Sequence, residues 1–154
     1  MKIHILRSEV WVPRPREEVF AFFSPAENLE ALTPHWLHFS ILSPGPISMR
    51  AGTRIRYRLR LHGIPLRWES EITAWEPPYR FVDEQRCGPY RRWVHEHQFL
   101  EHEEGTKIRD TVQYSVAGGL LVNRLLVAPD LSRIFEFRRQ KVAEIFRQKS
   151  GPAV

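Results

Sequence analysis

The chain has 154 residues, of which 42% are hydrophobic and 27% charged, and it carries a formal net charge of +5. This composition is ordinary for one globular domain and excludes a disordered or fibrous chain. The single cysteine, Cys87, excludes an internal disulfide framework and a multi-cysteine zinc site. No apolar run approaches the roughly 20 residues of a membrane-spanning helix, and the opening MKIHILR does not resemble a signal peptide. We therefore expect a cytoplasmic protein with no membrane span.

One strand and two short helices are predicted in the N-terminal part. Residues 2–12 alternate like a strand, and Pro15 followed by an acidic first turn predicts a helix that ends at Phe23. Ser24-Pro25-Ala26-Glu27 then has the spacing of a capping box and predicts a second helix ending at Leu32.

The middle of the chain, from Trp36 to Val116, is predicted to be a series of strands separated by turn signals. These signals are Pro44-Gly45-Pro46, His62-Gly63, Pro77-Pro78, Gly88-Pro89 and Glu103-Glu104-Gly105. Their regular spacing is typical of an antiparallel meander. A final helix is expected from about Leu120 to Gln148, and Pro129 should kink it or mark a new start.

The arginine-rich strand 53–61 allows a register to be predicted. Every second residue is arginine, so the arginines share the outer face and the apolar residues share the inner one. A turn at Gly63-Ile64 would place Tyr57 opposite Ser70 on the inner face. The same register pairs Leu59 with Trp68, Arg58 with Glu69 and Arg56 with Glu71.

The stretch Trp93 to Phe99 places two histidines, His95 and His97, on an aromatic strand face. A three-residue turn before this strand sets Asp83 opposite His95, and the following turn sets His97 opposite Asp110. Buried imidazoles need hydrogen-bond partners, so this face is a polar network or the lining of a ligand cavity. The predicted inner face contains Tyr57, Trp68, Ser70, Phe81, Asp83, Gln85, Trp93, His95, His97, Asp110 and Tyr114.

Three interpretations of these polar residues remain open. They could bind a ligand carbonyl or hydroxyl, form a structural network, or perform acid–base catalysis, for which His95, His97, Asp83 and Asp110 are the candidates. His-x-His with an aspartate could also hold a metal, but strand alternation alone produces that spacing, and we expect neither a metal nor another cofactor.

The last helix contributes Ile134 and Arg138 to the predicted ligand site. Arg138 falls on or beside the apolar stripe, where it either extends to the rim or reaches inward to Asp110 or Asp83. In the inward arrangement, the guanidinium would close one end of the cavity with a charge-assisted bond.

Several local patterns resemble the START-like, or SRPBCC, helix-grip superfamily. They are Val10-Trp11-Val12-Pro13 before Glu18-Val19-Phe20-Ala21-Phe22-Phe23, Asn28-Leu29-Glu30-Ala31-Leu32-Thr33-Pro34, Trp75-Glu76-Pro77-Pro78-Tyr79-Arg80-Phe81, and Gly105-Thr106 with Asp110 and Tyr114. The resemblance implies an α+β helix-grip fold of order β-α-α-β-β-β-β-β-β-α. In it, a curved antiparallel sheet of about seven strands wraps a long C-terminal helix. One START-like domain, residues 1–150, is expected, with a short tail at 151–154.

The resemblance implies a mostly apolar cavity between sheet and helix, and it leaves the activity open because the superfamily includes carriers and cyclases. Our first hypothesis is binding or carriage of a small hydrophobic molecule. The alternatives are a polyketide-cyclase-like or dehydratase-like enzyme, and a module that docks on protein or RNA through its basic convex face. The arginines are dispersed along the chain, so we do not expect a nucleic-acid partner.

Overall fold

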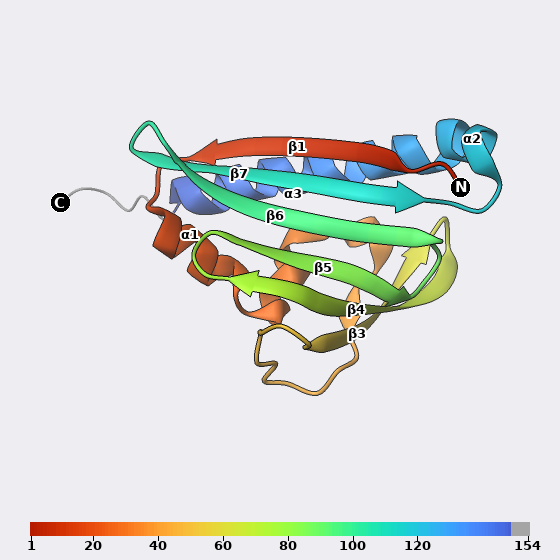
Figure 1. Cartoon of the computed structure of the whole chain (residues 1–154), viewed down its shortest axis with the longest axis horizontal. Helices are drawn as coiled ribbons and strands as arrows, with labels where there is room; N and C mark the ends of the chain where they lie inside the picture. The colour runs from red at the N-terminus through yellow and green to blue at the C-terminus, as the bar shows by residue number, and fades with distance from the viewer. Residues whose placement is uncertain (149–154) are drawn as a thin grey trace.

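The computed structural model of the protein describes residues 1–148 as one antiparallel sheet with helices packed on one face (Figure 1). The seven strands follow the order β1-β7-β6-β5-β4-β3-β2, so the first and last strands in the sequence are neighbours. The predicted tail at 151–154 lies outside the described residues. The elements are β1 (His4–Val12), α1 (Arg16–Phe23), η1 (Ala26–Leu32), η2 (His35–Leu37), β2 (Ser40–Ile41), β3 (Arg54–Leu61), β4 (Ile64–Glu76), β5 (Arg80–Cys87), β6 (Arg92–His102), β7 (Gly105–Ser115), α2 (Gly119–Val122), η3 (Asn123–Val127) and α3 (Ala128–Gln148).

The N-terminal helices differ from the prediction after Phe23. The predicted second helix is a 3-10 helix, η1, and Ser24 does not cap it: its Oγ donates to the carbonyl of Phe20, 3.2 Å away. Ser24 has right-handed helical backbone angles, whereas an N-cap residue is extended, and Pro25 takes that place. Trp36 also differs from prediction, because it lies in the 3-10 helix η2 and not in a strand.

The β3–β4 hairpin turns one residue earlier than predicted. The two turn residues are His62 and Gly63, with φ of 51° and 79°, and Leu61 pairs with Ile64. A two-residue hairpin turn of this kind needs positive φ at both positions, which a β-branched residue such as Ile64 resists. Tyr57 therefore pairs with Trp68 in place of Ser70. The partner moves by two residues, so every side chain stays on its predicted face.

The strands that carry the histidines have the predicted register. Asp83 pairs with His95 in the β5–β6 ladder, and His97 pairs with Asp110 in the β6–β7 ladder. The β6–β7 turn uses Glu103 and Glu104, both with positive φ. Trp93, His95, His97 and Phe99 are all buried, as a single inward face requires.

The C-terminal helix consists of three continuous segments. The helical turn α2 and the π-helical segment η3 precede α3, which begins at Ala128 beside Pro129. Proline has no backbone N–H, so a new start at this point agrees with the prediction. The long helix α3 runs beside β1 (Figure 1) and buries Leu131, Phe135, Val142 and Phe146. Among residues 1–148, no helix is both long and apolar enough to cross a bilayer.

The core has two parts with different packing. One part, near α1, includes Phe20, Phe81, Phe99 and Phe146, with edge-on contacts between the rings of Phe20 and Phe99. The other part surrounds Trp68 and Trp93 and receives Leu131 and Phe135 from α3. The second part forms most of the wall of the cavity described next, and the first part completes it with Phe23, Leu32, Ile72 and Phe81.

Candidate functional site

A cavity of about 180 Å³ lies between the inner face of the sheet, η1 and the first half of α3. It is lined by ten of the thirteen predicted ligand-site residues: Tyr57, Trp68, Ser70, Phe81, Asp83, Trp93, His95, His97, Ile134 and Arg138. On α3 the lining ends at Arg138, because Val142 and Phe146 fill the core beyond this point.

Three predicted site residues lie outside the cavity lining. Gln85 closes the β5–β6 turn, because its side chain donates to the carbonyl of Tyr90 and accepts from the Tyr90 N–H. Tyr114 donates from its hydroxyl to Asn123 at 2.9 Å. Asp110 lies behind the histidines, where it contacts both rings.

One wall of the cavity was missed by the sequence analysis. It comes from η1 and the residues around it, and includes Asn28, Leu29, Leu32 and Thr33. A short 3-10 helix has no 3.6-residue stripe to reveal which side is buried. The polar side chains of this wall bond to backbone carbonyls: Asn28 donates to Phe22 at 2.6 Å and Thr33 to Leu29 at 2.7 Å.

The half of the cavity nearest β3 and β4 is aromatic. The Tyr57 and Trp68 rings stack at 5.9 Å, and the Trp93 ring meets Trp68 edge-on at 5.3 Å. Ser70 Oγ lies 3.0 Å from both the Trp68 N–H and the Tyr57 hydroxyl. Burial raises the pKa of Tyr57, so its hydroxyl stays protonated. This half therefore presents flat apolar walls on which the polar atoms of Tyr57, Trp68 and Ser70 are already bonded to one another.

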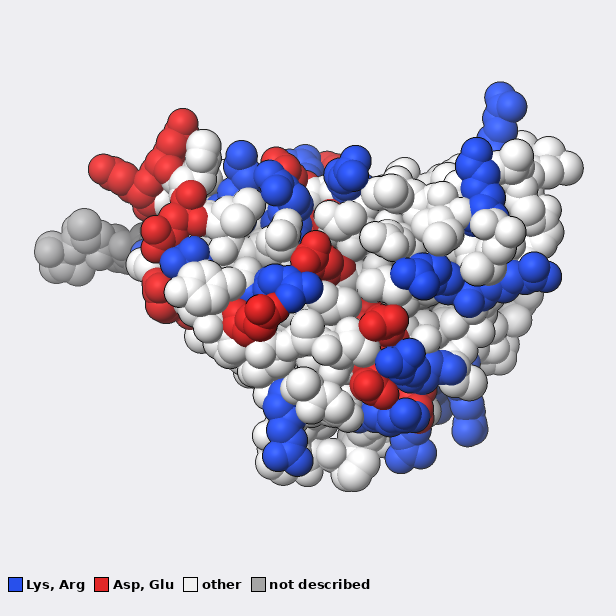
Figure 2. Space-filling model, in the orientation of Figure 1, with Lys and Arg blue, Asp and Glu red and all other residues white. Residues whose placement is uncertain are grey.

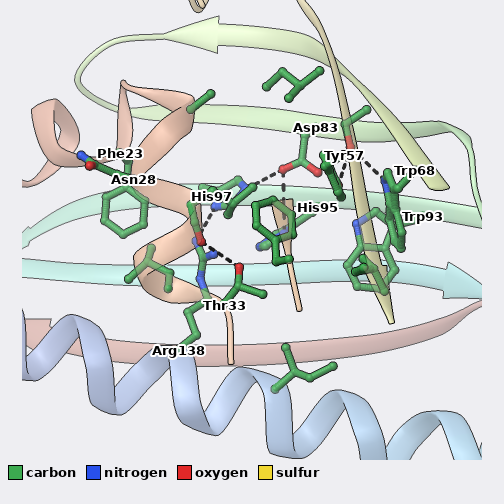
Figure 3. Close-up of a pocket in the computed structure, with 18 of the residues that line it drawn as sticks. Phe23, Asn28, Thr33, Tyr57, Trp68, Asp83, Trp93, His95, His97 and Arg138 are labelled. Atoms are coloured by element: carbon green, nitrogen blue, oxygen red, sulfur yellow. Dashed lines mark hydrogen bonds and ion pairs between the residues drawn. The ribbon is translucent and has the colours of Figure 1, made fainter. Parts of the chain in front are cut away.

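The other half contains a buried histidine–aspartate cluster (Figure 3). Although the backbone pairs Asp83 with His95, the shortest side-chain contacts are diagonal: His97 Nε2 lies 2.7 Å from Asp83 Oδ2, and His95 Nε2 lies 2.8 Å from Asp110 Oδ1. His97 Nδ1 also lies 3.1 Å from Asp110 Oδ1. Asp110 thus holds one nitrogen of each ring.

The two histidines have opposite pKa shifts. Burial lowers the pKa of His97, but its hydrogen bonds to Asp110 and Asp83 outweigh burial and raise it above the usual value. Burial and the neighbouring His97 lower the pKa of His95, despite its bond to Asp110. Of the two rings, His97 is therefore the one that more readily takes up a second proton, and its Nε2 lies within hydrogen-bond distance of Asp83. His95 is neutral, donates from Nε2 to Asp110, and keeps Nδ1 as a hydrogen-bond acceptor.

Arg138 points inward and balances the charge of the cluster (Figure 3). The residue is 7% exposed, its Nη2 lies 3.3 Å from His97 Nδ1, and its Nε lies 3.7 Å from Asp110 Oδ2. Burial raises the pKa of Asp110, but the Arg138 guanidinium and the two imidazoles outweigh it and hold that pKa well below its usual range. The guanidinium thus supplies positive charge beside the two carboxylates of the cluster.

Asp83, His95 and His97 also form a set of possible metal ligands, with one atom of each within 4.8 Å of the others. The two imidazole rings are stacked, with centroids 3.7 Å apart and planes 25° apart. A ring nitrogen binds a metal in the plane of its ring at about 2.0–2.1 Å. Two nearly parallel rings do not converge on one ion, so this geometry suits hydrogen bonding better than metal binding.

A curved antiparallel sheet that grips a long C-terminal helix over a cavity defines the helix-grip class of proteins, as the resemblance implied. Residues 12–137 match the family described as polyketide cyclase / dehydrase and lipid transport, and the chain belongs to this family. A search of curated proteins finds no match.

Solved structures with the same fold come from bacteria and plants. The protein TTHA0849 from Thermus thermophilus is 23% identical, with a TM-score of 0.71 over 96% of this chain and 100% of that one. The Zhui aromatase/cyclase from a Streptomyces species is 14% identical, with a TM-score of 0.76 over 99% and 98%. Ginseng major latex-like protein 151 from Panax ginseng is 9% identical, with a TM-score of 0.70 over 94% and 97%.

Proposed function

We propose that the protein binds a small aromatic molecule that carries a hydroxyl group. The observation that carries this proposal is the unused hydrogen-bonding capacity at the polar end of an otherwise apolar cavity. His95 Nδ1 lies 3.9 Å from Asp83 Oδ2, beyond hydrogen-bond distance, and the Asp83 side chain is 19% exposed, more than its partners. Both groups accept hydrogen bonds.

The aromatic walls of the cavity would bind the ring of such a ligand, and the hydrogen-bond acceptors would bind its hydroxyl group. Trp68, Trp93 and Tyr57 offer flat surfaces on which an aromatic ring stacks. A ligand hydroxyl can donate to His95 Nδ1 or to Asp83, whereas an ether or an unsubstituted ring leaves His95 Nδ1 without a partner. Family membership supports the apolar part of the proposal, and the aromatase/cyclase among the structural relatives agrees with a ring-containing ligand.

The test compares two probes that differ in one hydrogen-bond donor. We expect 2-naphthol to bind about tenfold more tightly than 2-methoxynaphthalene in isothermal titration calorimetry, which is the scale of one hydrogen bond to a buried acceptor. His95→Gln should weaken this preference, because glutamine can still donate to Asp110 but its amide oxygen does not take the position and direction of the Nδ1 lone pair.

His102→Gln is the matched control, because His102 is exposed and lies outside the cavity lining. It should bind both probes as the parent does. Equal affinity of the parent for the two probes, or an unchanged preference in His95→Gln, would reject the hydroxyl contact. Native mass spectrometry of the purified protein, with extraction of any bound molecule, would identify the natural ligand.

A second candidate is acid–base catalysis on the same ligand, and the opposite pKa shifts of His95 and His97 favour it. Two adjacent imidazoles that differ in proton affinity are an arrangement that proton transfer uses. In an enzyme, His95→Gln would lower turnover of the extracted ligand by roughly 10²–10⁴-fold and leave its binding nearly intact. A carrier would show weaker binding and no turnover in either form.

A further inference from the structure

The segment that joins β7 to α3 exposes four leucines. Leu120, Leu121, Leu125 and Leu126, in α2 and η3, are between 57% and 66% exposed. Single exposed apolar residues are common on proteins, but a contiguous group of large ones is typical of an interaction surface. We call these four residues the leucine patch.

The fold itself directs the leucine patch outward. Asn123, in the middle of the segment, is buried: its Oδ1 accepts from the Tyr114 hydroxyl at 2.9 Å and its Nδ2 donates to His4 Nδ1 at 3.2 Å. The main contacts of α2 are with η3 and not with a strand. The segment is therefore attached through Asn123 and the partly buried Val127, and its leucines have no apolar element to cover them among residues 1–148.

The surroundings of the leucine patch are basic. Segments 1–8, 87–95 and 111–129 meet at this end of the sheet, where His4 pairs with Tyr114 and Arg92 with Ser115. Together they contain no Asp or Glu, and their cations are Lys2, Arg7, Arg91, Arg92 and Arg124. Figure 2 shows blue and white atoms, and no red ones, at the right-hand end of the molecule, where Figure 1 places α2 and the N-terminus. The next acid along the chain, Asp130, is bonded to His62.

We propose that the leucine patch docks the protein on the surface of a membrane containing anionic lipid. Exposed leucines surrounded by cations match a surface that is negative outside and apolar beneath, because the leucines enter the acyl boundary while Lys and Arg lie among the headgroups. A second copy of the chain fits less well, since a symmetric contact would place the same cations opposite one another.

The test is co-sedimentation with phosphatidylcholine vesicles prepared with and without phosphatidylglycerol. We expect binding to the anionic vesicles that weakens as salt is added. Leu121→Asp/Leu125→Asp should lower the partition coefficient by about tenfold or more. Arg124→Gln should lower it about fivefold, the effect of one cation near such a surface. These side chains are exposed, so circular dichroism should show the parental fold for each variant.

Leu42→Asp is the matched control: Leu42 is an exposed leucine in the loop after β2, which Figure 1 draws on the side of the molecule away from α2. It should bind vesicles as the parent does. The proposal is overturned if the parent binds anionic and neutral vesicles equally, or if the double aspartate variant binds as the parent does. It is also overturned if the parent does not bind vesicles and is a dimer in analytical ultracentrifugation, while the double variant is a monomer.

Discussion

At the scale of single residues, Asp110 organises the polar cluster without lining the cavity. It accepts hydrogen bonds from His95 and His97 and faces the Arg138 guanidinium. Each contact constrains a group that does line the cavity, so Asp110 fixes which nitrogen of His95 remains an acceptor. Without the charge of Asp110, Asp83 would be the one remaining carboxylate near the Arg138 guanidinium and the His97 ring.

Asp110→Asn should therefore destabilise the protein strongly, by about 3–5 kcal/mol at neutral pH, the typical cost of breaking a buried ion pair. The lowered pKa of Asp110 sets the pH dependence: the stabilisation is present above the unfolded value of about 3.9 and is lost as pH falls through the folded pKa. The gap in unfolding free energy between parent and variant should thus narrow as the solution becomes acidic. Urea unfolding at a series of pH values measures it.

Asp130→Asn provides the comparison, because Asp130 is bonded to an exposed histidine, His62. Its cost should stay below about 1 kcal/mol. If Asp110→Asn lowers the unfolding free energy as little as Asp130→Asn does, or by the same amount at all pH values, the Asp110 carboxylate is not a stabilising buried charge.

At the scale of elements, the β3–β4 hairpin shows how turn chemistry sets a register. Gly63 takes a φ of 79°, and a Cβ added there would meet no atom within 4 Å. The preference for glycine is therefore a matter of backbone conformation and not of space. The same turn places Tyr57 opposite Trp68, and so sets the aromatic wall of the cavity.

Substitutions at Gly63 should follow the cost of a left-handed backbone. Gly63→Ala should cost about 1–2 kcal/mol, Gly63→Asn less, and Gly63→Val more, because asparagine tolerates positive φ and a β-branched residue resists it. Thermal unfolding of the three variants gives the order. Equal losses in all three would mean that the turn differs from the one described.

At the scale of the whole molecule, the core is divided between a filled half and a half that surrounds the cavity. Phe99 is 1% exposed, lies outside the cavity lining and contacts Phe20, Phe23 and Phe81. Phe135, on α3, lines the cavity and therefore has fewer partners on one side. Truncating a side chain that does not line the cavity should lower stability alone, whereas truncating one that lines it should also change ligand affinity.

Phe99→Ala should cost about 3–5 kcal/mol, the range for truncating a large aromatic residue in a packed core. Phe135→Ala should cost about 2–3 kcal/mol, since part of its surface already faces a void. In the variants that remain folded, we expect only Phe135→Ala to change the affinity for 2-naphthol. A change of affinity in Phe99→Ala alone would place the ligand elsewhere.

Much of the fold could be predicted from periodicity and turn residues. Alternation placed His95 and His97 on one inner face, and the error in the β3–β4 turn left the faces intact because the register moved by two residues. The wall formed by η1 could not be predicted, because a 3-10 helix carries no clear stripe. The cytoplasmic location and the roles of the site residues stay predictions.

The sequence by itself determined the order of elements, the inward histidines and the backbone pairing of Asp83 with His95, because these follow from local alternation and turn residues. Only the tertiary structure decided the diagonal contacts of His95 with Asp110 and His97 with Asp83, the inward path of Arg138, and the end of the cavity at that residue. The polar side chains of the cluster have several possible partners, on three strands and a helix, so backbone pairing alone does not determine their contacts. The packing of α3 against the sheet is a non-local contact that no short stretch of sequence encodes.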